Sequence, residues 1–144
     1  MGGLLKKSIK AQVAMEYALS ITLLLAPLGL ISGFAYLTLN DTLNVFFLQN
    51  SMDRLANSIE DIYLHEPGTS TQVYVTIPHG FNYSNSYLGN TSGYGNRISI
   101  DYKGNNPFRK VAANITGNLQ KLPGTFVYNV SKQDYYSVNV SVIT

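Results

Sequence analysis

The sequence contains no cysteine and few charged residues. Without cysteine, neither a disulfide framework nor a cysteine-based zinc site can form, so the fold must depend on core burial or on assembly. Charged residues make up 12% of the 144 residues, against about 25% in an average soluble protein. Together with the abundance of Tyr, Asn, Ser and Thr, this composition is atypical of a cytosolic enzyme and favours a surface exposed outside the cell.

A basic stripe for a polyanion is also missing. The formal net charge is +2, from 10 basic and 8 acidic residues. Three of the basic residues, Lys6, Lys7 and Lys10, precede the first hydrophobic segment. Without residues 1–11 the chain keeps seven basic residues against its 8 acidic ones, a net charge near −1. We therefore expect no nucleic-acid partner.

A long hydrophobic segment follows these lysines. Ala18–Leu39, the apolar run, contains no charged residue and reaches the ~20 residues that span a bilayer. It is longer than the ~7–15-residue apolar region of a cleavable secretory signal. Lysines on its N-terminal side predict that this end stays cytoplasmic and that the rest of the chain lies outside.

The helical pattern continues beyond the apolar run. Apolar residues recur at spacings of four and three, the stripe of an amphipathic helix, with polar residues between them. The stripe consists of Leu48, Met52, Leu55, Ile59 and Ile62. The helix is expected to end near Glu66-Pro67-Gly68, where proline and glycine interrupt it.

From Thr71 onward the pattern changes to the alternation typical of strands. About five strands are predicted, at 73–77, 98–102, 111–115, 126–130 and 136–142. The segment 81–96, rich in Asn, Ser, Tyr and Gly, is predicted to be a loop. The expected fold is α+β: a long N-terminal α-helix packed on a small antiparallel β-sheet or sandwich.

The residues around the start of the apolar run carry the most specific motif. Residues 6–17 read KKSIKAQVAMEY, and with the helix that follows they resemble the class III signal peptide of archaeal type IV pilins. In that family a membrane prepilin peptidase cuts on the cytoplasmic side, before a Gln. The resemblance, which covers about residues 6–39, implies a cut between Ala11 and Gln12. Ala11 stands where glycine is common in the family.

Glu16 is an acid at the start of an otherwise uncharged segment. A charge in a bilayer is costly unless it is paired or near the interface, so a position at headgroup depth with no further role is the simplest interpretation. The resemblance implies instead that Glu16, fifth in the mature chain, pairs with the free amine of an adjacent subunit and sets the stagger between chains.

The resemblance divides the chain into four segments. Residues 1–11 are a cleaved signal peptide, 12–39 a transmembrane and filament-core helix, 40–66 an amphipathic helix, and 67–144 an extracellular β domain.

Three residues within the apolar run bear on assembly. Pro27 removes a backbone hydrogen bond; it is either a tolerated transmembrane proline or a point of local melting that lets helices bundle. Gly29 and Gly33 form a small-xxx-small pair that permits close approach of another helix.

Six Asn-x-Ser/Thr sequons are present, where chance from the Asn, Ser and Thr content gives about two. In the predicted strands, the asparagines of the sequons alternate with apolar residues, which predicts that these asparagines point to solvent. We expect glycosylation at Asn82, Asn90, Asn114, Asn129 and Asn139. Asn40 is the exception, because it lies too near the membrane and the helix bundle.

The sequence predicts no catalytic constellation, no metal site and no cofactor. Only His65 and His79 are available as histidines, and neither has a partner at a ligand spacing. The leading hypothesis is therefore a structural filament subunit whose partners are copies of itself, other pilins, the prepilin peptidase and, before assembly, the membrane. The alternatives are a minor pilin or archaellum accessory protein, and an uncut signal-anchored surface binding module or secreted enzyme.

Overall fold

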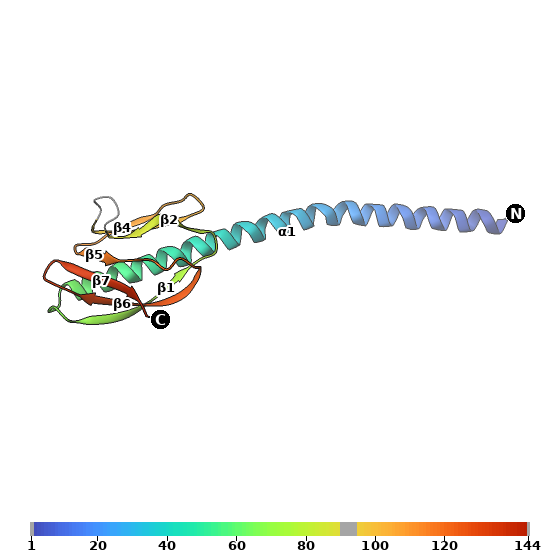
Figure 1. The fold of residues 1–144 in the computed structure, drawn as a ribbon. Coiled ribbons are helices and arrows are strands. Elements are labelled where there is room, and N and C mark those ends of the chain that lie inside the picture. The colour runs from blue at the N-terminus through green and yellow to red at the C-terminus, as the bar shows by residue number, and fades with distance from the viewer. Residues whose placement is uncertain (1, 90–94, 144) are drawn as a thin grey trace. The chain divides into compact units, whose positions relative to one another are not determined.

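The computed structural model describes residues 2–89 and 95–143, with side chains described from Lys10 onward. The chain divides into two compact units, Met1–Thr42 and Leu43–Thr144, which we call the N-terminal unit and the β unit. Helix α1 (Gly2–Tyr63) contributes to both. The strands described after it are β1 (Ser70–Ile77), β2 (Phe81–Leu88), β3 (Arg97–Tyr102), β4 (Phe108–Lys110), β5 (Asn114–Gly117), β6 (Gly124–Lys132) and β7 (Ser137–Val142) (Figure 1).

The part of α1 that lies in the β unit buries the predicted stripe. Each of its five apolar residues is at most 2% exposed, whereas Asn50, Asn57 and Glu60 on the intervening positions are exposed. This agrees with the periodicity, because residues three and four apart share one face of a helix. The stripe prediction is confirmed.

The C-terminal end of α1 is held by a buried lysine. Lys132 of β6 is 7% exposed, donates from its ammonium to the Tyr63 carbonyl and lies 4.7 Å from the centre of the Tyr63 ring. A cation at this place satisfies one of the carbonyls left unpaired at a helix end and complements the helix dipole. The helix ends just before Glu66-Pro67-Gly68, as expected.

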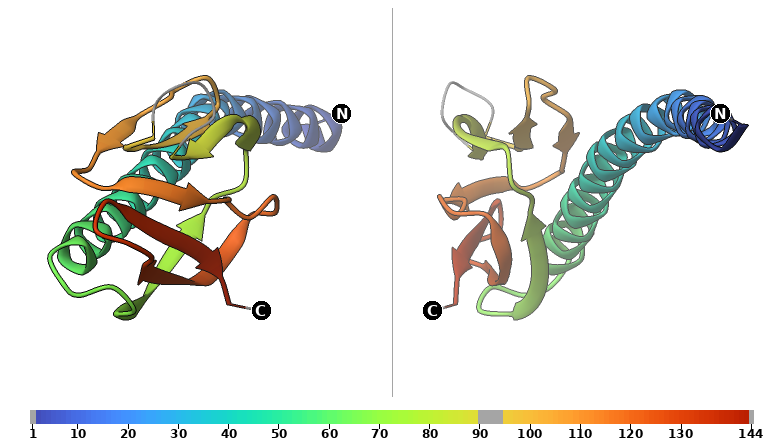
Figure 2. Two further views of the ribbon diagram at one scale, coloured as in Figure 1. Left: turned by 60° about the vertical axis from the view of Figure 1, so that its left-hand side comes forward. Right: turned by 90° about the vertical axis from the view of Figure 1, so that its right-hand side faces the viewer.

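The strands form two sheets (Figure 2). The larger has the order β1-β6-β7-β5 and the smaller the order β2-β3-β4. All the strand pairs are antiparallel except β5 with β7, which are parallel. The α+β class is confirmed, and the larger sheet is mixed rather than purely antiparallel.

Side chains of α1 contact both sheets. The Ser51 hydroxyl accepts the N–H of Thr76 on β1 at 3.0 Å, and the Asn44 amide donates to the Tyr102 hydroxyl on β3 at 3.2 Å. The inward positions of the strands join the helix stripe in one core. The most completely buried hydrophobic strand residues, at 0–1% exposure, are Val75, Ile77, Ile98, Ile100, Ile115, Tyr128, Val130, Val138 and Val140.

Two strand predictions were wrong. The segment 81–96 is not a loop throughout, because 81–88 forms β2 and pairs with β3. The expected single strand at 111–115 is interrupted. Its first part follows β4 in the smaller sheet, and its last part is the start of β5 in the larger sheet. Val111 and Ala113 are buried as the alternation predicts, at 3% and 0% exposure, while the chain crosses between the sheets.

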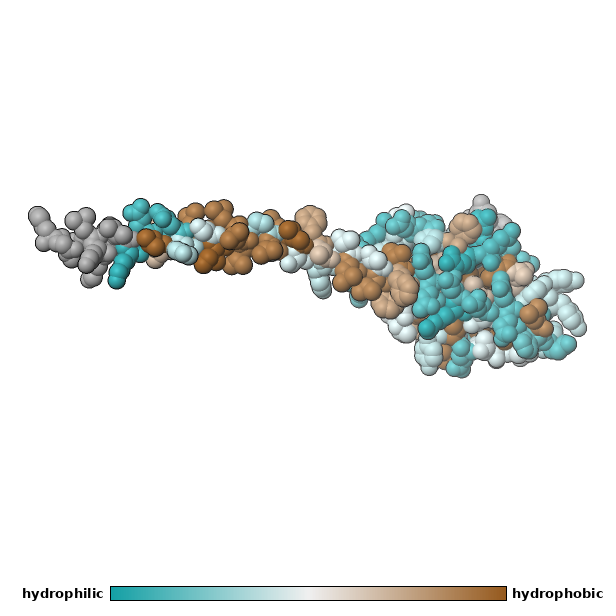
Figure 3. Space-filling model, turned by 180° about the vertical axis from the view of Figure 1, so that it is seen from behind, coloured by the Kyte–Doolittle hydropathy of each residue, from teal (hydrophilic) through white to brown (hydrophobic). Residues whose placement is uncertain are grey.

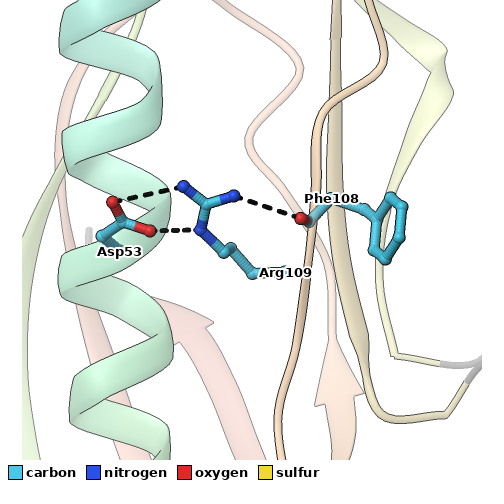
Figure 4. A network of polar contacts seen from close by, with 3 residues as sticks. All are labelled: Asp53, Phe108 and Arg109. Atoms are coloured by element: carbon cyan, nitrogen blue, oxygen red, sulfur yellow. Dashed lines mark hydrogen bonds and ion pairs between the residues drawn. The ribbon is translucent and has the colours of Figure 1, made fainter.

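An ion pair connects α1 to the smaller sheet. Arg109 of β4 donates from Nε to one carboxylate oxygen of Asp53 and from Nη2 to the other at 3.3 Å (Figure 4). Arg109 also donates from Nη1 to the Phe108 carbonyl at 3.4 Å. The hydrogen bond from Arg109 lowers the pKa of Asp53 below its ordinary value of 3.8, against a smaller opposing effect of burial.

The lowered pKa of Asp53 predicts an acid-sensitive contribution to stability. A carboxyl whose pKa is lower in the folded state stabilises the protein above its unfolded pKa, and this stabilisation is lost as the pH falls through the folded value. Both side chains are partly exposed, at 40% and 47%, so Asp53→Asn should lower the free energy of unfolding by only about 0.5–1 kcal/mol at neutral pH. Urea unfolding of the full chain in detergent measures this.

The difference between Asp53→Asn and wild type should shrink as the pH is lowered below about 4. Glu60→Gln, an exposed acid on the same helix, is the control and should leave stability unchanged. Equal stability of Asp53→Asn and wild type at neutral pH contradicts the prediction.

Candidate processing and assembly segment

The apolar run is not covered by any described side chain of the N-terminal unit. Every described side chain from Lys10 to Asn40 is exposed, and the large apolar ones range from 47% exposed at Val13 to 73% at Phe34. Figure 3 shows these hydrophobic side chains along the segment. The helix is long and apolar enough to cross a membrane. Such a surface requires either lipid or other apolar helices around it.

The serine and threonine hydroxyls of this segment are satisfied within the helix. Each donates to the carbonyl four residues earlier, at 2.8–3.0 Å. The residues are Ser20, Thr22, Ser32 and Thr38. Side chains that bond back to their own helix present no unpaired donor to a surrounding apolar medium. The polar residues in the run are thus compatible with burial in lipid or in a helix bundle.

The predicted processing site lies inside α1. Ala11 and Gln12 are both helical, with helix on either side of the bond between them. Gln12 donates from its side-chain amide to Glu16 at 3.4 Å, one turn away. A carboxylate offers about four acceptor positions, so this long bond leaves Glu16 able to accept from a further donor. The structure therefore brings Gln12 and Glu16 together on one face.

Pro27 does not interrupt α1. The helix is assigned continuously through it, although proline has no N–H to donate to the carbonyl of Leu23. Gly29 and Gly33 lie on an open flank, because a Cβ built at either would meet no atom within 4 Å. No described side chain of the N-terminal unit therefore uses the space that these two glycines leave free.

Three predicted sequons gather on the outer face of the larger sheet. Asn114, Asn129 and Asn139 lie on β5, β6 and β7, with β7 in the middle. Asn114 is exposed and the other two are half-buried, while their sequence neighbours point into the core. The predicted solvent-facing phase is confirmed. Because residues i and i+2 of a strand share a face, each asparagine lies beside the hydroxyl residue of its own sequon.

This sequon face carries no charge at its described outward positions. It consists of Ser70, Gln72, Tyr74, Thr76, Asn114, Thr116, Thr125, Val127, Asn129, Ser131, Ser137, Asn139 and Ser141. Protein surfaces ordinarily intersperse charges of both signs. A face of amides and hydroxyls is therefore unusual, and Asn-x-Ser/Thr patterns fall on it readily.

The other sequons are dispersed. Asn82 is exposed at the start of β2, where its side-chain oxygen accepts the N–H of Ser84 at 3.1 Å. Asn40 is exposed on α1 in the N-terminal unit. Asn90 lies outside the described residues.

The described residues form no metal-ligating cluster. They contain no group of three or more His, Asp or Glu side chains able to hold a metal. The ring Nδ1 of the exposed His65 lies 2.7 Å from the Asp61 carbonyl and, because a carbonyl only accepts, must donate to it. His65 thus belongs to the end of the helix.

No family model, curated protein or solved structure matches this chain. Its function must therefore be inferred from its own pattern and geometry. Sequence reasoning missed Lys132 and the Asp53–Arg109 pair, which depend on strands far along the chain. It also missed the side chains of β2, because that segment was assigned to a loop.

Proposed function

We propose that this chain is a structural subunit of an archaeal type IV pilus-like surface filament. The precursor inserts in the membrane and is cut by a prepilin peptidase between Ala11 and Gln12. The mature helix then assembles with copies of itself and with other pilins. The observation that supports this most is the apolar run, none of whose side chains is buried in the N-terminal unit.

The apolar run must be covered by other apolar groups both in the membrane-inserted precursor and in the filament. Apolar surface left in water costs about 25 cal/mol per Å², so lipid covers the helix in the precursor and neighbouring helices cover it in the filament. Transfer from lipid to a bundle gains little hydrophobic energy, so packing and polar pairing must supply the specificity. Gly29 and Gly33 allow close approach, and their flank is open.

Glu16 supplies the polar pairing in this proposal. A carboxylate enclosed by apolar helices is destabilising unless a cation meets it. Cleavage before Gln12 creates a free N-terminal amine. The amine of a neighbouring subunit can neutralise Glu16 only when the two helices are displaced by one particular distance along their axes. The weak bond between Gln12 and Glu16 leaves the carboxylate free for that contact.

An uncut, signal-anchored surface module is the second candidate. A single apolar helix near the N-terminus serves equally well as a permanent anchor. A minor pilin or archaellum accessory protein would share the same processing and the same helix. The cleaved pilins and the uncut module differ in the mature N-terminus and in assembly.

Mass spectrometry of the mature N-terminus separates these candidates. Wild-type protein in the sheared extracellular fraction should begin at Gln12. Glu16→Gln should still be cut but should be at least about tenfold depleted from that fraction, because the loss of one buried charge pair is worth several kcal/mol. Glu60→Gln, in the β unit, is the matched control. A chain that begins at Met1 or Gly2 and stays in membranes contradicts the proposal.

Glycosylation of the sequon face is part of the same proposal. The lysines ahead of the apolar run favour an extracellular location for these asparagines, and Asn114, Asn129 and Asn139 lie on an outward face. Replacing each of them, or Asn82, by Gln should remove one glycan from the intact mass of the native protein. Asn118→Gln, at an exposed asparagine outside any sequon, should change the mass only by the substitution. An intact mass without glycan, unaffected by all four replacements, contradicts this assignment.

A further inference from the structure

A cleft of about 580 Å³ opens in the β unit beside β2. One wall comes from β2 itself, and the rest comes from the turn between β3 and β4 and from the residues after β5. Its side chains include Tyr83, Asn85, Tyr87, Asn106, Asn118 and Leu119. None of the described residues that line it carries a charge. The cleft is distinct from the assembly segment and from the sequon face.

The β2 wall is a large bulge. Asn82 pairs with Asp101, and Tyr87 pairs with Ser99, so four residues of β2 stand opposite a single residue of β3. Bulges of this kind redirect side chains away from the regular ladder and are over-represented next to functional sites. Here the displaced residues, 83–86, line the cleft.

Hydrogen bonds fix the bulge in one conformation. The Ser86 hydroxyl donates to the Asn82 carbonyl at 2.7 Å and accepts the N–H of Asp101 at 2.8 Å. The Asn85 amide donates to the carboxylate of Asp101 at 2.9 Å. Asp101 is 3% exposed, and it also accepts the N–H of Gly104 at 3.0 Å. A buried carboxylate therefore connects the bulge to the turn after β3.

The opposite wall is equally constrained. Gly117 has φ 143°, and a Cβ there would lie 2.0 Å from the Val140 carbonyl oxygen, so only glycine fits. The side chain of Asn106 accepts a hydrogen bond from the hydroxyl of Ser99. The exposed Asn118 follows Gly117 directly and borders the cleft. The walls are thus held in place by the fold.

We propose that this cleft binds a neutral saccharide. Amide and hydroxyl groups match the ring of hydroxyls on a sugar in both donating and accepting capacity. Tyr83 and Tyr87 add aromatic surface together with polar tips, which suits the apolar C–H face of a pyranose. The Lys121 ammonium lies 5.4 Å from the centre of the Tyr83 ring, but Lys121 is not among the lining residues. An uncharged lining disfavours phosphates, nucleotides and acidic peptides, whose binding sites place cations on the ligand.

Two sources of saccharide are compatible with this chemistry. One is an external glycan, which would make the subunit adhesive. The other is a glycan on the chain itself, since the sequon at Asn82 adjoins the bulge. Neither source depends on filament assembly, and only the second rests on the glycosylation that belongs to the proposed function.

A glycan array tests the inference. The full chain, made in a host without N-glycosylation and held in a detergent without a sugar headgroup, is applied to neutral hexose and N-acetylhexosamine oligosaccharides, with uronic-acid and sulfated glycans as comparators. Neutral glycans should bind. Asn118→Ala should weaken binding about threefold to tenfold, as expected for one lost hydrogen bond, and Asn118→Trp should abolish it by filling the cleft.

Asn57→Ala, an exposed asparagine on α1, is the matched control and should bind as wild type does. Circular dichroism confirms that each variant is folded. Absence of binding by the folded wild type, a preference for charged glycans, or binding insensitive to both Asn118 variants overturns the inference.

The glycosylated native chain separates the two sources. If the glycan at Asn82 fills the cleft, native protein should bind the array more weakly than the unglycosylated chain, and Asn82→Gln should restore binding. Equal binding by all three identifies an external ligand.

Discussion

Exposed apolar surface on the first part of α1 is the constraint on which this account depends. A helix that is hydrophobic all round and has no partner in its own unit is stable only inside another apolar phase. Its serine and threonine hydroxyls bond back to the helix, so these polar groups do not resist that burial. The proposed membrane-inserted precursor and the proposed filament are two ways of meeting the same requirement.

The same helix solves a different packing problem in the β unit. From Leu48 onward it offers a stripe instead of a full cylinder of apolar residues, and two sheets cover that stripe. The end of α1 is then fixed from the strand side by Lys132. The β unit therefore contains its own core, and its surface is left for other tasks. The uncharged sequon face and the cleft beside β2 are the two surfaces that stand out.

Features with a local period were predictable from the sequence. The stripe of α1 and the buried apolar positions of β1, β3, β6 and β7 follow from spacings of three, four and two residues. β2 was missed because the bulge at 83–86 breaks its alternation and because its Asn and Ser residues are typical of loops. It is stabilised from outside its own sequence, by Asp101 and the pairing with β3. The passage of the chain from the smaller to the larger sheet after β4 likewise depends on tertiary structure and not on a local pattern.

The candidate functional residues were likewise predictable only where a local pattern determines their position. The exposure of Asn114 followed from strand phase, whereas the gathering of three sequons on one face depended on the parallel pairing of β5 with β7, which no local pattern encodes. The proposed partner of Glu16 belongs to another chain, so neither the sequence period nor the fold of one chain contains it. The cleft is formed by segments that are distant in sequence, and one of them contains a glycine at a position with no room for a Cβ.

In the proposed filament, other copies of this helix cover the apolar run after assembly. Because the chain has no cysteine, a single spin label at Leu24→Cys can report on it. Packed helices lie about 8–10 Å apart between their axes, so in the sheared extracellular fraction labels on neighbouring subunits should show strong dipolar broadening of their spectra. Dilution with unlabelled subunits should relieve this broadening. A label that is found only in membranes, without broadening at any dilution, contradicts the account.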